Sequence, residues 1–166
     1  MAEQSVLQSF PEQDHNHTAC LAQAIASAEQ ACAARGVRLT DLRKRVLELV
    51  WDSHAPVKAY DLLDRLRQER SGVAPPTVYR ALDFLVAEGL IHRIESLNAF
   101  VGCGGPDDAG HQGQFLICRA CGETAELNDP DIADVLARKA QRLGFRIDLS
   151  TVELKGLCPR CVQDSR

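Results

Sequence analysis

Two Cys-x-x-Cys pairs constrain this chain more than any other feature. The first is "CRAC", with Cys118 and Cys121, and the second is "CPRC", with Cys158 and Cys161. Four thiolates complete a tetrahedral zinc site and leave no open position for a substrate. Such a site would join both ends of the segment between the pairs. The spacing therefore predicts a structural zinc ion held by all four cysteines.

Two other interpretations of these pairs fit the sequence less well. A redox dithiol, as in thioredoxin-like proteins, needs only one pair. A zinc deaminase needs a His-x-Glu or Cys-x-Glu partner upstream of a "PCxxC" segment, and neither His92 nor Cys103 has a glutamate two residues later. No pairing of a nucleophile with a base stands out either. We therefore expect no enzyme.

Length and composition indicate one domain or two small ones with a real apolar core. The chain has 166 residues, of which 45% are hydrophobic, and no apolar run approaches the roughly 20 residues that span a bilayer. The start, "MAEQSVLQSFPEQDHNH", lacks the order of a signal peptide. We expect a cytoplasmic protein without a membrane partner. Because the cytoplasm keeps thiols reduced, seven cysteines indicate metal rather than disulfides.

The net charge of −4 argues against nucleic acid, but the charge is unevenly spread. Residues 1–34 contain no Lys or Arg, whereas residues 35–95 contain 11 basic and 9 acidic groups. The densest basic stretch consists of Arg35, Arg38, Arg43, Lys44 and Arg45. A local basic patch matters more for DNA binding than the overall sum.

The first hundred residues predict a winged helix-turn-helix. Apolar periodicity predicts a helix over 18–34, a second after the N-cap Thr40, and a short third one after Pro56. A fourth helix over 76–89 would begin at Pro76 and stop at Gly89. "LIHRIES" and "AFVGC" then read as a β-hairpin that turns near Leu97 and Asn98.

The fourth helix would be the recognition helix. We expect its core face to contain Val78, Ala81, Leu82, Leu85 and Val86. The side chains left off the core face are Thr77, Tyr79, Arg80, Asp83 and Phe84. An arginine at the start of such a helix can donate two hydrogen bonds to a guanine edge.

We therefore expect DNA contacts from Tyr60, Thr77, Tyr79 and Arg80, with Arg43 and Lys44 as further basic contacts. A solvated helix face is the plain alternative for any exposed arginine. The Pro-Pro entry and the following hairpin favour DNA.

The remainder predicts an α+β chain with a small C-terminal α/β domain. Residues 1–17 would be a flexible extension, 18–102 the winged-helix DNA-binding domain, 103–113 a Gly- and Asp-rich hinge, and 114–166 a zinc-stapled dimerisation domain. Within the last domain we expect strands at 114–118, 122–127 and 145–154, and a helix at 131–143. One side of that helix is apolar, with Ile132, Val135, Leu136, Ala140 and Leu143. A unit of about 50 residues seldom stands without a metal, disulfides or a partner subunit.

A second possible metal site combines His92, Cys103, His111 and Glu126. Two imidazoles, a thiolate and a carboxylate make a complete ligand set for zinc. The four come from the hairpin, its end, the hinge and the second domain, so a shared ion would tie the domains together. Spacing alone does not bring them together, and a solitary histidine on a hairpin is more often a surface group.

The segment "HNHTAC" places His15, His17 and Cys20 close together. They would form a weak extra metal site, although a terminal cluster of this kind is more often disordered. Cys32 falls on the apolar side of the first helix and is most simply a small buried residue.

The order of motifs resembles the ferric uptake regulator family, and its zinc-sensing branch in particular. The segments that carry the resemblance are "RLTDLRKRVLELV", "KAYDLLDRL", "PPTVYRALDFLVAEGLIHRIES", "AFVGC", "FLICRACG" and "GLCPRC". Iron-sensing relatives carry a "HHDH" stretch before the first cysteine pair, where this chain has "GPDDAGHQGQF". The thiolate of Cys103 likewise favours zinc over ferrous iron.

The resemblance implies a homodimer joined through the C-terminal domain, with one structural zinc on the four paired cysteines and one regulatory zinc in each subunit. The regulatory ligands of the family map onto His92, Cys103, His111 and Glu126. Metal-loaded members bind palindromic AT-rich operators of double-stranded DNA and repress metal-uptake genes, with no small-molecule substrate other than metal. We expect a zinc-responsive repressor. The alternatives are an iron, manganese, nickel or peroxide sensor of the same fold, or a zinc-stapled interaction module without specific DNA binding.

Overall fold

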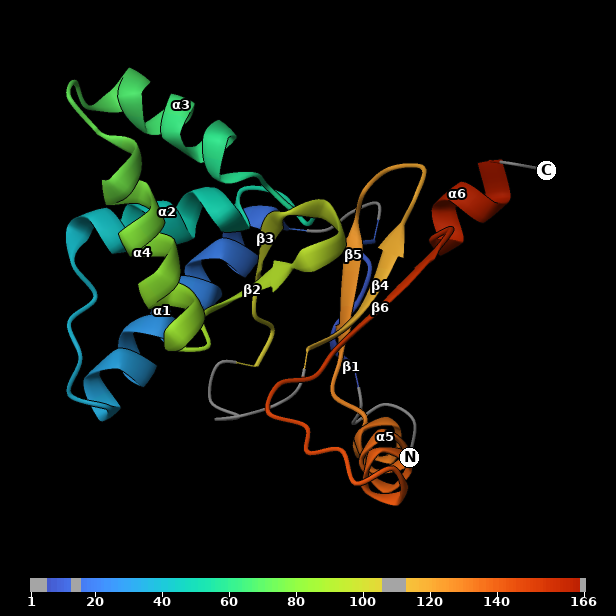
Figure 1. Ribbon diagram of the computed structural model, residues 1–166. Helices are drawn as coiled ribbons and strands as arrows, with labels where there is room; N and C mark the ends of the chain where they lie inside the picture. Colours follow the sequence, from blue (N-terminus) through green and yellow to red (C-terminus); the bar gives the residue numbers. More distant parts are fainter. Residues whose placement is uncertain (1–5, 13–15, 106–112, 165–166) are drawn as a thin grey trace. The chain divides into compact units, whose positions relative to one another are not determined.

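The chain forms two compact units that are connected twice along the sequence (Figure 1). The computed structural model describes residues 6–12, 16–105 and 113–164. The helical unit is Pro11–Ala109, and the sheet unit combines Met1–Phe10 with Gly110–Arg166. The chain therefore starts in the sheet unit, passes through the whole helical unit and then returns.

The helical unit has four helices followed by a hairpin, as the sequence predicts. Its elements are α1 (His17–Ala34), α2 (Asp41–Trp51), α3 (Ala59–Glu69), α4 (Pro75–Ala87), β2 (Ile91–Ile94), the 3-10 turn η2 (Glu95–Leu97) and β3 (Ala99–Gly102). β2 and β3 pair in antiparallel register. Asn98 takes the left-handed conformation at the turn, with φ 47°, which asparagine tolerates better than most residues.

Local signals set the helix ends close to their predicted positions. The hydroxyl of Thr40 accepts a hydrogen bond of 3.4 Å from the backbone N–H of Arg43, which confirms Thr40 as the N-cap of α2. α4 begins at Pro75, one residue earlier than expected, because a proline in the first turn loses no helical hydrogen bond. Gly89 follows the helix with φ 67°.

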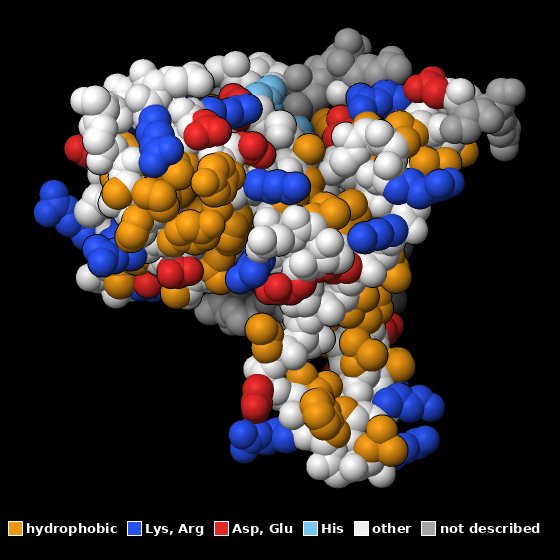
Figure 2. All heavy atoms as spheres, turned by 45° about the horizontal axis from the view of Figure 1, so that its top comes forward, with side chains coloured by type: hydrophobic (Ala, Val, Ile, Leu, Met, Phe, Trp, Pro, Cys, Tyr) orange, Lys and Arg blue, Asp and Glu red, His pale blue; other side chains and the backbone are white. Residues whose placement is uncertain are grey.

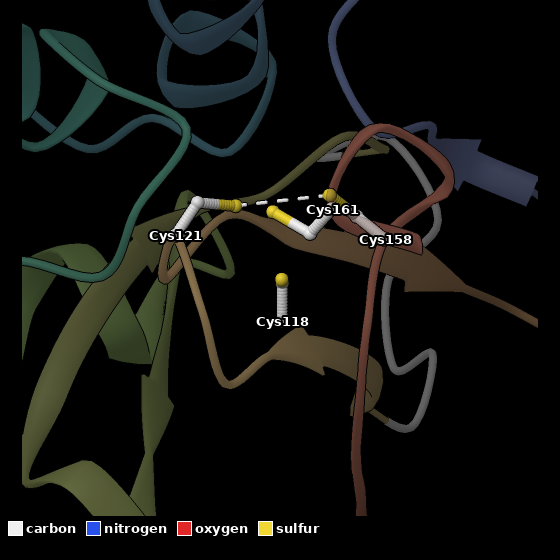
Figure 3. Close-up of side chains that lie close together, drawn as sticks. All are labelled: Cys118, Cys121, Cys158 and Cys161. Atoms are coloured by element: carbon white, nitrogen blue, oxygen red, sulfur yellow. Dashed lines mark hydrogen bonds between the residues drawn. The ribbon is translucent and has the colours of Figure 1, made fainter. Parts of the chain in front are cut away.

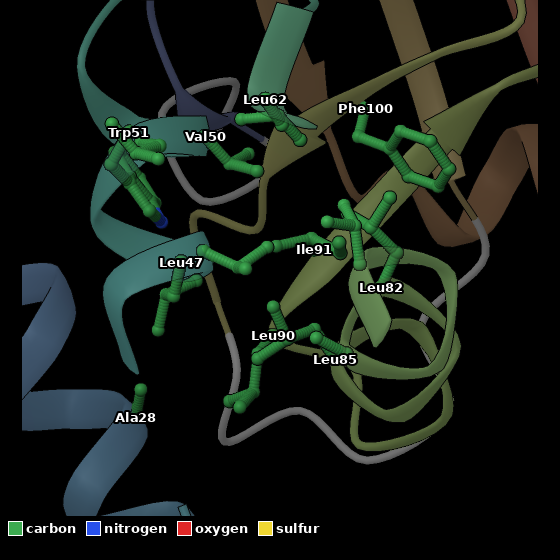
Figure 4. Close-up of a cluster of buried hydrophobic side chains, with 14 of the residues drawn as sticks. Ala28, Leu47, Val50, Trp51, Leu62, Leu82, Leu85, Leu90, Ile91 and Phe100 are labelled. Atoms are coloured by element: carbon green, nitrogen blue, oxygen red, sulfur yellow. The ribbon is translucent and has the colours of Figure 1, made fainter. Parts of the chain in front are cut away.

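The core of the helical unit lies between its helices and its hairpin (Figure 4). Leu47 of α2, Leu62 of α3 and Leu82 of α4 are completely buried, and Ile91 of β2 is nearly so. Cys32 is also buried within this cluster, as expected for a small apolar residue. This core fixes the directions in which α3, α4 and the hairpin present their outer side chains.

Two side chains of α4 differ from the predicted pattern. Val86 was expected in the core, but it is 40% exposed because it borders an open cavity beside β3. Phe84 was expected off the core, yet it is partly buried against it. The guanidinium of Arg43 lies 3.6 Å from the centre of the Phe84 ring and shields its other side.

The sheet unit has four strands in the order β1-β5-β4-β6. Its elements are β1 (Val6–Gln8), β4 (Gly113–Cys118), β5 (Thr124–Leu127), α5 (Pro130–Arg142), β6 (Thr151–Gly156) and α6 (Pro159–Asp164). β4 pairs antiparallel with β5 and parallel with β6. The strand expected over 145–154 starts later, at Thr151, because Thr151 is the residue that pairs with Gly113 at the start of β4.

Part of the segment 1–17, for which the sequence predicts a flexible extension, forms the strand β1. Val6 pairs with Leu127 and Gln8 with Glu126, so β1 forms one edge of the sheet. α1 then begins at His17. The outer edge of β5 would otherwise present unpaired backbone groups, and β1 satisfies some of them.

α5 presents apolar side chains that the described part of the chain leaves uncovered. Val135 is 45% exposed and Leu136 is 39% exposed. In the lower part of Figure 2, hydrophobic side chains lie between Lys and Arg side chains. The apolar side predicted for this helix is therefore present, and the residues that the structure describes leave it exposed. None of the helices in the described part of the chain has both the length and the apolar character of a bilayer span.

Candidate metal centres and nucleic-acid interface

The structure brings together the four thiols of the two Cys-x-x-Cys pairs (Figure 3). Cys118 ends β4 and Cys121 lies in the turn that follows, while Cys158 and Cys161 flank the first residues of α6. Their four sulfur atoms all lie within 4.8 Å of one another. All four belong to the sheet unit, so this cluster is complete within one compact body.

Backbone hydrogen bonds shape both turns of the cluster. The N–H of Gly122 donates to the carbonyl of Cys118 over 2.9 Å, and the N–H of Val162 donates to the carbonyl of Cys158 over 3.0 Å. The N–H of Arg119 donates to the carbonyl of Gly156 and joins the first turn to the end of β6, just before the second turn. Gly122 has φ 80°, a conformation that favours glycine. The sulfur positions therefore follow from the backbone and not only from side-chain rotamers.

The electrostatics of the cluster suit a divalent cation. Backbone N–H groups of Cys121 and Cys158 lower the pKa of the Cys118 thiol to about 6, which favours its thiolate. Hydrogen bonding to Cys158 and burial raise the pKa of Cys161 to about 12, and burial raises the pKa of Cys121. The sulfurs of Cys121 and Cys158 lie 3.7 Å apart. A bound zinc ion would replace the shared protons and hold all four groups as thiolates.

An ion pair lies beside the cluster and supports it from outside. Arg160 donates a hydrogen bond of 2.8 Å to Oε1 of Glu123, and Sγ of Cys121 lies 3.5 Å from Oε2 of the same carboxylate. Groups of this kind orient the residues that ligate a metal. The donor set therefore fits a tetrahedral zinc ion, both in its chemistry and in its surroundings.

The second predicted ligand set is divided between the two units. His92 in β2 and Cys103 just after β3 belong to the helical unit, and their ligand atoms lie within 4.8 Å of each other. The N–H of Cys103 donates to the carbonyl of Leu90, which fixes the cysteine at the base of the hairpin. Glu126 is a buried residue of β5 in the sheet unit. His111 lies outside the described residues.

The predicted cluster of His15, His17 and Cys20 takes a different form. His15 lies outside the described residues. His17 is the first residue of α1, and its ring contacts the ring of His54. Cys20 is partly buried against the core of the helical unit. The sequence offered no sign of His54, because this residue lies far from His17 along the chain.

The predicted recognition helix presents most of its candidate DNA contacts to solvent. Tyr79 is 49% exposed, Arg80 is exposed and Thr77 is partly exposed. Tyr60, in the first turn of α3, is 67% exposed. Figure 2 shows hydrophobic side chains gathered on one face of the helical unit with Lys and Arg side chains around them. Aromatic and basic groups together suit a nucleic-acid backbone and base edges.

A cavity of about 440 Å³ adds three polar residues that were not among the predicted DNA contacts. Lys58, Arg93 and Asn98 line it together with Tyr60 and Tyr79. Arg93 donates to the amide oxygen of Asn98 over 3.0 Å, which holds the guanidinium on the hairpin. The sequence placed Arg93 in a predicted hairpin strand and Asn98 at its turn, but it gave no sign that they meet Lys58.

Two other candidate DNA contacts already have partners within the helical unit. Arg43 donates to the carbonyl of Arg38 over 2.7 Å and lies over the Phe84 ring. Lys44 forms an ion pair of 2.6 Å with Glu29 of α1. Both side chains therefore contribute to the contact of α2 with its neighbours.

The sequence model of the Ferric uptake regulator family matches residues 34–155 of this chain. The chain belongs to this family. The match covers α2, α3, α4, the hairpin and most of the sheet unit.

Individual relatives extend this result over more of the chain. The zinc uptake regulation protein of Escherichia coli (strain K12) is 41% identical over 139 residues, which are 84% of this chain and 81% of that protein. A solved structure of a zinc uptake regulator complexed with zinc and DNA gives a TM-score of 0.83 at 39% identity, covering 87% of this chain and 97% of that one. The crystal structure of holo XcZur gives a TM-score of 0.78 at 48% identity, with coverages of 84% and 96%.

Proposed function

We propose that this protein is a zinc-responsive transcriptional repressor that binds DNA as a homodimer. The observation that carries the proposal is the likeness, over most of both chains, to a zinc uptake regulator complexed with zinc and DNA. The four-thiol cluster adds a site of the right chemistry in this chain itself. A DNA-binding repressor acts where the chromosome is, so we place the protein in the cytoplasm.

Two zinc ions per subunit have different tasks in this proposal. Cys118, Cys121, Cys158 and Cys161 hold the structural ion in a closed thiolate site. The regulatory ion has the ligands His92, Cys103, His111 and Glu126. Their mixture of nitrogen, sulfur and oxygen donors gives a weaker site than four thiolates, which suits an ion that must bind and leave.

The exposed apolar side of α5 supports a homodimer. Asp131, Ile132, Val135 and Leu136 line a surface cavity of about 280 Å³. Exposed hydrophobic groups on a small unit are typical of a subunit interface. A second copy of the sheet unit would cover this surface and place two helical units on one DNA molecule.

DNA reading depends on α4 in each subunit. Arg80 and Tyr79 reach the major groove from the exposed side of the helix, and Arg80 donates to a guanine edge. The two half-sites must lie about 34 Å apart, one turn of B-DNA, so the operator is a palindrome. AT-rich palindromes near zinc-uptake genes are the targets that we propose.

Zinc controls DNA affinity through the relation between the two units of each subunit. His92 and Cys103 belong to the unit that binds DNA, and Glu126 to the unit that dimerises. When all of them ligate one ion, fewer separations of the recognition helices are populated. Apparent DNA affinity then rises in proportion to the competent fraction. A coupling of about 1–3 kcal/mol is typical of such switches, and DNA must tighten zinc binding by the same factor.

The decisive experiment is DNA binding during a metal titration, with bound metal counted per subunit. Full-length protein with its structural zinc in place is titrated with zinc, ferrous iron, manganese or nickel against an AT-rich palindrome and an unrelated duplex. We expect a second zinc per subunit to bind as affinity for the palindrome rises. Equal binding to both duplexes at every zinc level would refute the proposal, and a response to ferrous iron alone would reassign the metal.

A further inference from the structure

His17 and His54 form a pair outside both ligand sets described above. His17 begins α1, and His54 lies in the connection between α2 and α3. Both belong to the helical unit. Their ring centres lie 5.4 Å apart, with an angle of 72° between the ring planes.

A ring-centre separation of 5.4 Å is common for an edge-on ring contact, and it is also compatible with two histidines that share one metal ion. Zinc–nitrogen bonds of about 2.0–2.1 Å at a tetrahedral angle place the centres of two ligating imidazoles about 5 Å apart. We propose that His17 and His54 form an accessory site for a borderline divalent cation such as zinc. The site is independent of the regulatory function proposed above.

The donor set defines the kind of metal that would bind. Neutral imidazole suits zinc, copper and nickel, and it does not suit magnesium or calcium. Within the described residues, no third His, Cys, Asp or Glu forms a ligand cluster with these two histidines. Only two protein ligands hold the ion, so it exchanges faster than an ion in the four-thiol cluster.

Cys20 is not part of this site, although the sequence placed it with His17. It lies one turn further along α1 and is partly buried against the core. Burial raises the pKa of its thiol, which disfavours the thiolate that a metal requires. The accessory site is therefore an all-nitrogen site.

Metal at this pair would hold the start of α1 against the connection after α2. The fully buried residues of α1 begin at Ile25, and within the first turn Cys20 is only partly buried against the core. The carboxamide of Asn16 accepts a hydrogen bond from the N–H of Ala19 and caps this turn. A ligand that binds only the folded state raises the temperature of unfolding. Zinc at about 100 times its dissociation constant should raise Tm by roughly 5 °C or more.

The test uses a full-length Cys103→Ser background, which removes the proposed regulatory zinc and keeps the four-thiol cluster. Zinc binding is measured by isothermal titration, and Tm is measured with and without added zinc. We expect one weak exchangeable zinc per subunit. His17→Gln and His54→Gln should each lower its affinity at least tenfold. The double variant should bind zinc no more weakly than either single variant, because one imidazole alone does not hold the ion.

His15→Gln is the matched control, and it should bind zinc like its parent. The metal-free Tm should be the same in all variants, while the rise with zinc disappears in those of His17 and His54. Unchanged zinc affinity in the folded double variant would overturn the proposal. Loss of zinc binding in His15→Gln alone would also overturn it. In the wild-type background, His17→Gln should keep zinc-dependent DNA binding, so failure of this site is distinct from failure of the repressor function.

Discussion

The four-cysteine cluster and the set of His92, Cys103, His111 and Glu126 differ in how their ligands are distributed. All four cysteines lie in the sheet unit, where backbone hydrogen bonds already shape the two turns. The second set draws His92 and Cys103 from the helical unit and Glu126 from the sheet unit. A site within one unit stabilises that unit alone. A site shared by two units would link metal binding to their arrangement, which the proposed zinc switch requires.

The donor atoms of the two sets also indicate support of the fold for one set and regulation for the other. Four thiolates form a closed site that contributes directly to folding. In the proposed divided set, Cys103 would supply one thiolate beside imidazole and carboxylate donors, so metal occupancy would follow the zinc level of the cell. Removing ligands from the two sets should therefore have separate effects, on folding for one and on regulation for the other.

The largest effect is expected for Cys158→Ser. Loss of one thiolate opens the closed site, and structural zinc contributes about 10 kcal/mol or more to the folding of small zinc modules. The variant should lose its tightly bound zinc and dissociate or unfold, as measured by metal content, thermal unfolding and size-exclusion chromatography. Cys20→Ser, which changes a cysteine outside the cluster, is the control. A stable dimer with unchanged metal content would remove the distinction between the two sets.

Arg80→Ala should have the second largest effect, a loss of DNA affinity. It should leave both zinc ions in place. Loss of a bidentate contact to guanine costs about 1–3 kcal/mol per half-site and relaxes the preference at one base position. Binding to the operator and to random DNA is compared by fluorescence anisotropy. Arg146→Ala, an exposed arginine paired with Asp148 in the sheet unit, is the control. A wild-type ratio of operator to random binding in Arg80→Ala would exclude Arg80 from base reading.

Cys103→Ser tests the divided set most directly. The serine keeps the size of the side chain but removes the soft ligand, so the variant should lose one zinc per subunit and keep the other. Zinc should then no longer raise operator affinity, a loss of about 5- to 150-fold at saturating zinc. The variant should still fold and dimerise. Zinc-dependent repression at the wild-type level would show that Cys103 is not a regulatory ligand.

The smallest effect is expected for Lys44→Ala, because Lys44 already pairs with Glu29. If Lys44 also contacts phosphate, operator and random DNA should weaken alike, and the slope of log affinity against log salt should flatten by about one. Glu29→Ala releases Lys44 and should leave DNA affinity unchanged or slightly higher. A salt slope that Lys44→Ala does not change would assign the lysine to contacts within the protein alone.

The sequence predicted the features that depend on neighbouring residues. The Cys-x-x-Cys spacing placed two thiols in each turn, and the N-cap Thr40 and the stop at Gly89 bounded their helices. It also predicted the one-sided apolar pattern of α5. The sequence could not show that the described part of the chain leaves this side exposed, because apolar periodicity does not say what covers a helix face.

The features that the sequence missed depend on residues far apart along the chain. His54 beside His17, and Arg93 with Lys58 in one cavity, result from how the helices of the helical unit pack. Val86 fits an apolar stripe but lies beside a cavity, and Phe84 is covered by Arg43. Periodicity describes one helix at a time and carries no information about these neighbours.

The pairing of β1 with β5 has a consequence for the order of folding during synthesis. Val6 leaves the ribosome early, but its partner Leu127 emerges only after the whole helical unit has been made. Synthesis adds about 5–20 residues per second, so that wait is on the order of ten seconds. Small helical domains usually fold in much less time. For this time β1 is an unpaired strand on a growing chain. Its length of only three residues limits the edge that it offers to other chains before β5 arrives.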